Sequence, residues 1–371
     1  MKRLIRYEFL KTITKEQLKQ NQIKDISKYV WGANVKYEDP LYDCKIYRII
    51  YSTTIPEKKK PVIASGFLSI PQINKNELPV VSYQHGTVLE KIKIPSNIDS
   101  SYETRLVLSQ LGGFGYIIIA ADYLGFGISN DNDSFLVLNC QSENSVDLYY
   151  ALLEILEIEK IKAIKYYVCG WSQGGFITLS LIDKLQKLKI NVNGGATAAC
   201  QNDLFACVNQ ILYFPRNNDA KWLSSILILI VYSFENYYNV SISKNIFKPE
   251  KYELTKKIYY KDPTLKSIDY NTDIKLLLKE EYFDPVYLKN SVLGKLLNNV
   301  QPYKFIANIP INMHYGEIDD TTTALILELC NNYQKNMGNN KVNLVYEGID
   351  ADHRRTFARA IPKWRNFFQS L

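Results

Sequence analysis

A serine set between two glycines is the first residue of this chain that could do chemistry. It is Ser172 in the segment GWSQG, residues 170–174, which matches the pattern Gly-x-Ser-x-Gly. By itself this pattern also fits an ordinary serine in a glycine-rich loop. Here an apolar run precedes it over 166–170, and an amphipathic helical pattern follows over 174–188. Ser172 is therefore predicted to be a nucleophile on a sharp strand-to-helix turn.

A serine hydroxyl needs a base to become a good nucleophile. The sequence contains three histidines, His85, His314 and His353. In a nucleophile-elbow architecture the partners follow the serine in the order acid, then histidine. His85 precedes Ser172, and His314 lies within a predicted buried strand. His353 follows the last predicted strand, on a predicted loop at the carboxyl edge of the sheet, so it is the predicted base. A surface loop histidine is the alternative.

The acid that orients the imidazole is predicted in the segment HYGEIDDTTT, directly after an apolar strand pattern. Asp319 lies a few residues beyond the predicted strand end and is the preferred acid. The adjacent Asp320 stays open as an alternative. Asp350 and Asp352 flank the predicted base, but the order of the elements disfavours them. Capping, or ion pairs with the neighbouring arginines, is the structural role expected for these two.

Acyl transfer also needs hydrogen-bond donors for an oxyanion. One predicted donor is the backbone N–H of Gln173, the residue after the nucleophile. The second is the backbone N–H of Thr87, in the segment SYQHGT after the run 79–83. Gly86 allows the turn that this donor requires. A simple strand-end turn is the alternative for this segment.

Three further side chains, His85, Trp171 and Tyr123, are assigned to the substrate pocket. Packing in the hydrophobic core is the alternative for Trp171. Asp122, beside Tyr123 at the end of a predicted strand, is expected to bind loop amides rather than to act in catalysis.

Short, nearly continuous apolar runs predict strands that are buried on both faces, as in a parallel sheet. Helical patterns lie between them, and this alternation predicts a doubly wound α/β domain. The predicted strands are 79–83, 116–123, 166–170, 192–199, 310–316 and 341–348. The predicted helices are 101–111, 142–160, 174–188, 322–336 and 355–370.

The N-terminal part adds an antiparallel pair and a helix. The runs 44–55 and 61–71 are rich in β-branched and aromatic residues and predict two paired strands. Thr14-Lys-Glu-Gln17 fits a capping box, which predicts a helix over 14–29. The expected sheet therefore has about eight strands and is mostly parallel, with helices on its flanks.

The segment 205–304 interrupts the alternation. It has helix-like stretches over 222–236 and 286–299 but no clear buried strand. We interpret it as a helical cap or lid over the carboxyl edge of the sheet, where open α/β sheets bind ligands. The expected division is a catalytic core of 1–204 and 305–371 and a cap insertion of 205–304. The apolar stretch within the cap is either a lid wall or an internal helix.

Taken together, the segments LPVVSYQHGT, AADYLGFG, GWSQGG and HYGEIDD, with a late histidine, resemble the α/β-hydrolase superfamily. Within it they look most like secretory-lipase-like serine esterases, which have similar YxHGT, DYxGxG and GxSQGG segments and a helical lid. The resemblance covers about 44–205 and 305–371. It implies a catalytic triad of Ser172, Asp319 and His353, with Thr87 and Gln173 at the oxyanion hole.

The resemblance implies an enzyme that cleaves carboxylic esters, small or lipid, through an acyl-enzyme and without a cofactor. A serine peptidase similar to prolyl oligopeptidases is one alternative, and a non-catalytic α/β-hydrolase scaffold is another. The chain departs from the family at Trp171, where a smaller or different aromatic side chain is common. No secretory signal is visible at the N-terminus, so the secretory label does not transfer.

The composition of the chain fits a globular protein with a large core. It has 371 residues, of which 46% are hydrophobic and 22% charged. The net charge of +7 comes from scattered lysines, which favours a solvated surface over nucleic-acid binding. Six widely spaced cysteines and three histidines predict buried free thiols and no metal site. A cytoplasmic protein without a transmembrane segment is expected.

Overall fold

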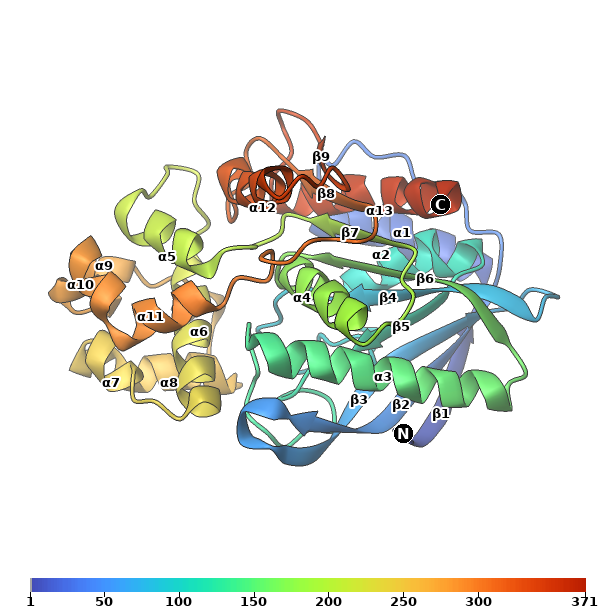
Figure 1. Ribbon diagram of the computed structural model, residues 1–371, viewed down its shortest axis with the longest axis horizontal. Coiled ribbons are helices and arrows are strands. Elements are labelled where there is room, and N and C mark those ends of the chain that lie inside the picture. The colour runs from blue at the N-terminus through green and yellow to red at the C-terminus, as the bar shows by residue number, and fades with distance from the viewer. Residues whose placement is uncertain (1) are drawn as a thin grey trace.

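One mixed sheet of nine strands organises the computed structural model, which describes residues 2–371 (Figure 1). The strand order is β1-β2-β3-β5-β4-β6-β7-β8-β9. The strands are β1 Leu4–Ile13, β2 Cys44–Ile55, β3 Lys60–Pro71, β4 Glu77–Gln84, β5 Ile117–Ala121, β6 Lys162–Trp171, β7 Gly194–Ala198, β8 Ile311–Tyr315 and β9 Val342–Tyr346. From β1 to β5 the neighbours pair antiparallel, and from β5 through β4 to β9 they pair parallel. The predicted α/β architecture is confirmed.

The N-terminal strands include one that the sequence pattern does not predict. The expected antiparallel pair is β2 and β3, whose register runs from Cys44 opposite Pro71 to Ile55 opposite Lys60. β1 pairs with β2 at the edge of the sheet. Charged residues interrupt the apolar residues of β1, and this hides it as a strand. Charges on an edge strand also discourage pairing with other chains.

Helices cover both faces of the sheet (Figure 1). The core helices are α1 Lys15–Tyr29, α2 Tyr102–Gln110, α3 Leu138–Ile158, α4 Gln173–Lys187, α12 Ala324–Asn336 and α13 His353–Ser370. One cluster of buried side chains joins α1, α2 and α13 to the sheet, with Leu18, Leu106 and Trp364 at its centre. A second cluster joins α3, α4 and α12 to the opposite face. Each large apolar side chain buried in this way contributes about 1.5–3 kcal/mol.

Seven α-helices lie between β7 and β8 and form a lobe beside the sheet, yellow-green to orange in Figure 1. They are α5 Leu204–Tyr213, α6 Leu223–Tyr238, α7 Ser243–Ile246, α8 Tyr252–Tyr260, α9 Ile274–Leu277, α10 Pro285–Asn290 and α11 Val292–Asn299. The 3-10 helices of the chain are η1 Pro56–Lys58, η2 Gly112–Phe114, η3 Pro249–Lys251, η4 Ser267–Asn271 and η5 Glu280–Phe283. The helical stretch expected over 286–299 is two helices, because Ser291 caps α11 and interrupts the run.

The helix α6 is rich in apolar residues, and every one of its residues from Leu223 to Phe234 is buried. A helix of this kind belongs in the centre of a domain. Of the two interpretations of this apolar stretch, the structure agrees with the internal helix. Its N-cap residue, Trp222, nevertheless reaches the cavity described below.

The helical lobe is tied to the loop after β5 by buried polar contacts. Lys261 Nζ lies 2.5 Å from Asp133 Oδ2, and both side chains are almost fully buried. The hydroxyl of Tyr259 donates to the carbonyl oxygen of Asp133 at 2.8 Å. The hydroxyl of Tyr237 donates to the carbonyl oxygen of Asn132 at 2.7 Å. Because a buried charge without its partner is costly, the ion pair holds the lobe against the core.

The state of the cysteines and the length of the apolar helices bear on two of the sequence predictions. The six cysteines are free and buried, as predicted. Within residues 2–371, none of the helices combines the length and the apolar character needed to cross a bilayer.

Candidate active site

Ser172 occupies the sharp turn between β6 and α4. Its backbone angles are φ 57° and ψ −120°, which are strained for a residue with a side chain. The turn is possible because two glycines allow close packing. A Cβ atom at Gly170 would collide with the backbone of Gly174, and one at Gly174 would collide with the carbonyl oxygen of Gln84 on β4. The predicted strand-turn-helix context of Ser172 is confirmed.

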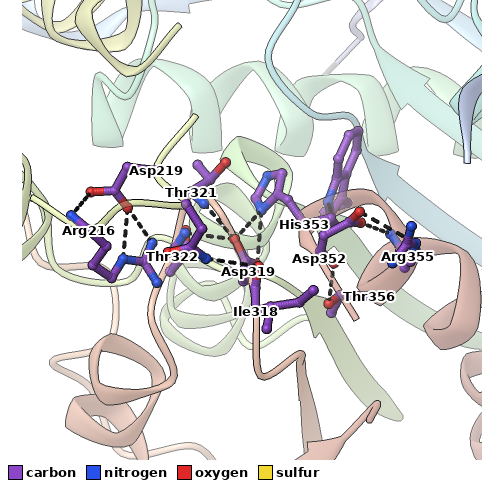
Figure 2. Close-up of polar contacts among 12 residues, drawn as sticks. Arg216, Asp219, Ile318, Asp319, Thr321, Thr322, Asp352, His353, Arg355 and Thr356 are labelled. Atoms are coloured by element: carbon purple, nitrogen blue, oxygen red, sulfur yellow. Dashed lines mark hydrogen bonds and ion pairs between the residues drawn. The ribbon is translucent and has the colours of Figure 1, made fainter. Parts of the chain in front are cut away.

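Asp319 and His353 are in direct contact, as Figure 2 shows. Nδ1 of His353 lies 3.0 Å from each carboxylate oxygen of Asp319. Since a carboxylate can only accept, Nδ1 carries the proton of the neutral imidazole and Nε2 is left as an acceptor. Asp319 Oδ1 also accepts from the backbone N–H groups of Thr321 and Thr322, both at 2.8 Å. These bonds fix the carboxylate behind the ring.

The two loops that carry this pair are joined to each other. Asp319 follows β8, and His353 is the first residue of α13. Gly316 brings the loops together, because a Cβ there would collide with the carbonyl oxygen of Ala351. The backbone N–H of Ile318 donates to that same oxygen at 3.2 Å. His353 is thus at a helix N-terminus rather than on a loop, and Asp352 caps that helix by accepting from the N–H of Arg355.

The surroundings of His353 favour its protonated form. Burial opposes protonation, but the charge and hydrogen bond of Asp319, helped by the charge of Asp320, outweigh it and raise the pKa of His353 above its usual value of 6.5. Among the described residues, His353 Nε2 has no hydrogen-bond partner. Ser172 and His353 line the same cavity, but no hydrogen bond joins the hydroxyl to Nε2.

Asp320 makes different contacts from Asp319. Its carbonyl oxygen accepts from the N–H of Ala220 in the helical lobe at 2.8 Å. Its side chain lines the cavity, and burial raises the pKa of its carboxyl group. Nδ1 of His353 donates to Asp319 and not to Asp320.

A cavity of about 600 Å³ opens beside Ser172. Both parts of the chain contribute to its lining. The core residues that line it include Thr87, Glu103, Trp171, Ser172, Asp320, His353 and Arg354, and those of the helical lobe are Trp222, Leu265, Tyr270 and Asn271. Its size is that of a small-ligand site. Glu103, Arg354 and the four lobe residues are site residues that sequence reasoning misses. Arg354 is next to the predicted base, His353, whereas Glu103 and the four lobe residues have no motif beside them, and only the fold brings these five to the cavity.

The predicted oxyanion loop has a well-defined backbone. Thr87 lines the cavity. The side chain of His85 turns away from it, with Nδ1 2.7 Å from the carbonyl oxygen of Gly86. Burial lowers the pKa of His85 to about 4, so the ring is neutral near pH 7, with its proton on Nδ1. Gln173 is the first residue of α4, and its N–H therefore has no partner within the helix.

The three assigned pocket side chains differ in position. Trp171 lines the cavity, stacks on Phe357 and donates from Nε1 to the carbonyl oxygen of His353 at 3.2 Å. His85 and Tyr123 are buried behind the wall, stacked at 4.0 Å, and neither lines the cavity. The hydroxyl of Tyr123 donates to the carbonyl oxygen of His85 at 3.3 Å.

The remaining acidic residues have structural roles, and those of Asp122 and Asp352 are the expected ones. Asp122 accepts from the backbone N–H of Ser96 at 2.9 Å and from the hydroxyl of Ser65 at 2.6 Å. Asp352 caps α13, as described above. Asp350 pairs with Arg359 at 2.7 Å rather than with the arginines next to His353.

Comparisons with known proteins give likenesses in structure only. The sequence matches no protein-family model and no curated protein. A solved structure of a Legionella pneumophila protein assigned as a hydrolase has a TM-score of 0.87 at 20% identity, over 99% of this chain and 98% of that one. The rice cell wall degrading esterase LipA from Xanthomonas oryzae has 0.81 at 16% identity, over 99% and 97%. Candida antarctica lipase A in its closed state has 0.68 at 12% identity, over 94% and 77%.

The chain has the α/β-hydrolase fold. The topology and these likenesses, each over nearly the whole chain, agree on this, and the fold predicted from the sequence is confirmed. In an α/β-hydrolase the nucleophile elbow follows a central strand, and Ser172 follows β6, which lies between β4 and β7.

Proposed function

We propose that this α/β-hydrolase is a serine esterase that cleaves carboxylic esters through an acyl-enzyme on Ser172. The observation that carries the proposal is the contact of Asp319 with His353, which lines the same cavity as Ser172. Support comes from Ser172 and His353, which lie on different elements and line one cavity, and from Asp319, which binds His353 from a third segment. The proposal also has support from two of the similar structures, which are an esterase and a lipase.

In the proposed reaction His353 Nε2 takes the proton of Ser172 while Oγ attacks the ester carbonyl carbon. The N–H groups of Thr87 and Gln173 stabilise the resulting oxyanion. When the intermediate collapses, the ester C–O bond breaks and His353 gives its proton to the leaving alcohol. Water, deprotonated by His353, then attacks the acyl carbon. The bond from that carbon to Oγ breaks, and His353 returns the proton to Oγ, which frees the acid and Ser172. Asp319 holds the Nδ1–H tautomer and stabilises the imidazolium.

The missing hydrogen bond between Ser172 and His353 is compatible with this role. In active sites without substrate, catalytic hydrogen bonds are often long and tighten only when substrate binds. His353 Nε2 faces no competing partner among the described residues, so it is available to the serine hydroxyl.

The helical segment 205–304 is proposed to act as the cap of the site, with 1–204 and 305–371 as the catalytic core. Trp222, Leu265 and Tyr270 of this segment line the cavity and would contact the substrate. The substrate would be a small-molecule or lipid ester. The buried free thiols are compatible with the reducing conditions of the cytoplasm, which is the proposed location.

The test is Ser172→Ala, with Ser180→Ala in the same helix as the matched control. Ser172→Ala is expected to abolish both the turnover of p-nitrophenyl acetate and labelling by a fluorophosphonate probe, while Ser180→Ala keeps both. Unchanged labelling of Ser172→Ala refutes the assignment. Cleavage of a peptide panel without any ester hydrolysis would indicate a peptidase. An acyl-length series of esters, with and without detergent, separates a soluble esterase from an interface-dependent lipase.

A further inference from the structure

A buried glutamate lies directly behind the predicted oxyanion loop. Glu103 is near the start of α2, and its side chain is only 11% exposed. It lines the cavity that holds Ser172. Its Oε1 accepts a hydrogen bond from the backbone N–H of Gly86 at 2.9 Å. The proposed mechanism gives this carboxyl group no task.

The carboxyl group of Glu103 acts on the backbone around Gly86. Both peptide groups that flank Gly86 are held by hydrogen bonds. In the peptide group between His85 and Gly86, the N–H of Gly86 donates to Glu103, and the carbonyl oxygen of His85 accepts from the hydroxyl of Tyr123 at 3.3 Å. In the second, the carbonyl oxygen of Gly86 accepts from His85 Nδ1. The N–H of this second peptide group is that of Thr87. Because a peptide group is planar, the direction of the Thr87 N–H is set by the direction of the Gly86 carbonyl.

Packing leaves Gly86 little freedom to move. A Cβ atom built on Gly86 would lie 2.8 Å from the ring of Trp171 and 3.1 Å from Glu103 Oε2. The loop is thus enclosed between an aromatic ring and a carboxyl group. A change at Glu103 therefore acts first on the backbone of Gly86.

We propose that Glu103 is a positioning residue, which holds the N–H of Gly86 so that the N–H of Thr87 points to the oxyanion. The proposal rests on the proposed function of this site. Glu103 acts through the backbone and does not touch the reacting atoms.

The buried position of Glu103 is unfavourable for the stability of the fold, so stability alone does not explain why a carboxyl group stands there. Burial raises the pKa of its carboxyl group to about 7, although the Gly86 N–H and the positive charge of Arg354 act in the opposite direction. Within residues 2–371 the only basic side chain within 4.0 Å of it is His85, which is neutral near pH 7. The other titratable groups around it are Tyr83, Tyr102 and Tyr123. Burying a carboxyl group without a cation lowers the stability of the folded protein. Its hydrogen bond to the loop is the role that we assign to it in return.

Three variants test the inference: Glu103→Ala, Glu103→Leu and Glu103→Gln. Ala and Leu remove the acceptor, and Leu fills the space. Gln keeps a neutral oxygen that can accept from Gly86. The exposed Glu157 on α3, substituted to Ala and Gln, is the matched control. For each variant, kcat and KM for p-nitrophenyl acetate are measured, together with the inhibition constant of phenylboronic acid. The boronate forms a tetrahedral adduct with the serine and so reports on the oxyanion site.

Glu103→Ala and Glu103→Leu are expected to lower kcat ten- to a hundred-fold, because small misplacements near the reacting centre are costly. KM should change less than threefold, and boronate inhibition should weaken in proportion to kcat. Glu103→Gln should restore kcat to within about threefold of the wild type. If Glu103→Ala does not fold, as judged by circular dichroism, Glu103→Leu and Glu103→Gln decide the matter.

A kcat within twofold of the wild type in the folded Ala or Leu variant overturns the inference. So does a loss that appears in KM alone, with boronate inhibition unchanged, since Glu103 would then act in substrate binding. These outcomes differ from failure of the proposed function. In that case the wild-type protein itself shows no ester turnover and no labelling of Ser172.

Discussion

Both carboxylate oxygens of Asp319 lie 3.0 Å from Nδ1 of His353, although 34 positions separate the two residues in the chain. Two N–H groups of the same loop hold the carboxylate in place. The pair is therefore preorganised before any substrate binds.

Asp319→Asn is expected to lower kcat for ester hydrolysis by about 10³- to 10⁴-fold, because the amide no longer holds the Nδ1–H tautomer. Asp320→Asn is the matched comparison and is expected to lower kcat less than tenfold, since Asp320 makes no hydrogen bond to the ring. Steady-state kinetics at saturating p-nitrophenyl acetate measure both. Equal losses in the two variants would contradict the assignment of Asp319 as the acid.

The activity of the wild type is expected to rise with pH through the pKa of His353. Only the neutral imidazole can accept the serine proton. The charge and hydrogen bond of Asp319 overcome the effect of burial and raise this pKa above 6.5. The acid limb of kcat/KM should therefore have its midpoint above that of an ordinary histidine. In Asp319→Asn the midpoint should move to lower pH, because the main cause of the raised pKa is removed. A midpoint that stays in place contradicts the prediction.

The buried carboxyl group of Glu103 should make stability depend on pH. Its pKa is raised by burial from 4.5 to about 7 in the folded protein. Between these values the folded state holds a proton that the unfolded state has lost, so stability falls as pH rises and stays low above pH 7. Relative to the wild type, Glu103→Gln should gain about 3 kcal/mol of unfolding free energy between pH 4 and pH 8. Urea unfolding at both pH values measures this, and Glu157→Gln should show no such change.

Lys261→Met is expected to destabilise the protein by about 3 kcal/mol or more, because Asp133 is then left buried without its partner. The double variant Lys261→Met/Asp133→Asn should recover part of this loss. Lys257→Met, at an exposed position of α8, is the control. Unfolding midpoints in urea measure the three variants. A loss in Lys261→Met no larger than in the control would show that the ion pair does not hold the lobe.

Much of the fold could be predicted because its signals are local. Continuous apolar runs separated by amphipathic helices mark a parallel sheet, and the strands β2 to β9 appear where the runs are. β1 could not be recognised, because Arg6, Glu8 and Lys11 interrupt its apolar residues at an exposed edge. The N-terminus of α13 was signalled by Asp352, a good N-cap residue, but the sequence interpretation places His353 on a loop.

The sequence by itself determined the types and the order of the chemical groups: a serine in a glycine-flanked turn, an acid after a later strand and a histidine after the last one. These features depend on residues that are close together in the chain, because backbone sterics and helix or strand periodicity act over short distances. Their roles in catalysis stay predictions. The tertiary structure alone decided that Asp319 rather than Asp320 bonds His353, and that Glu103 lies behind Gly86. It also decided which residues of the helical lobe reach the cavity. Such contacts join distant parts of the chain, and they depend on packing that no local pattern encodes.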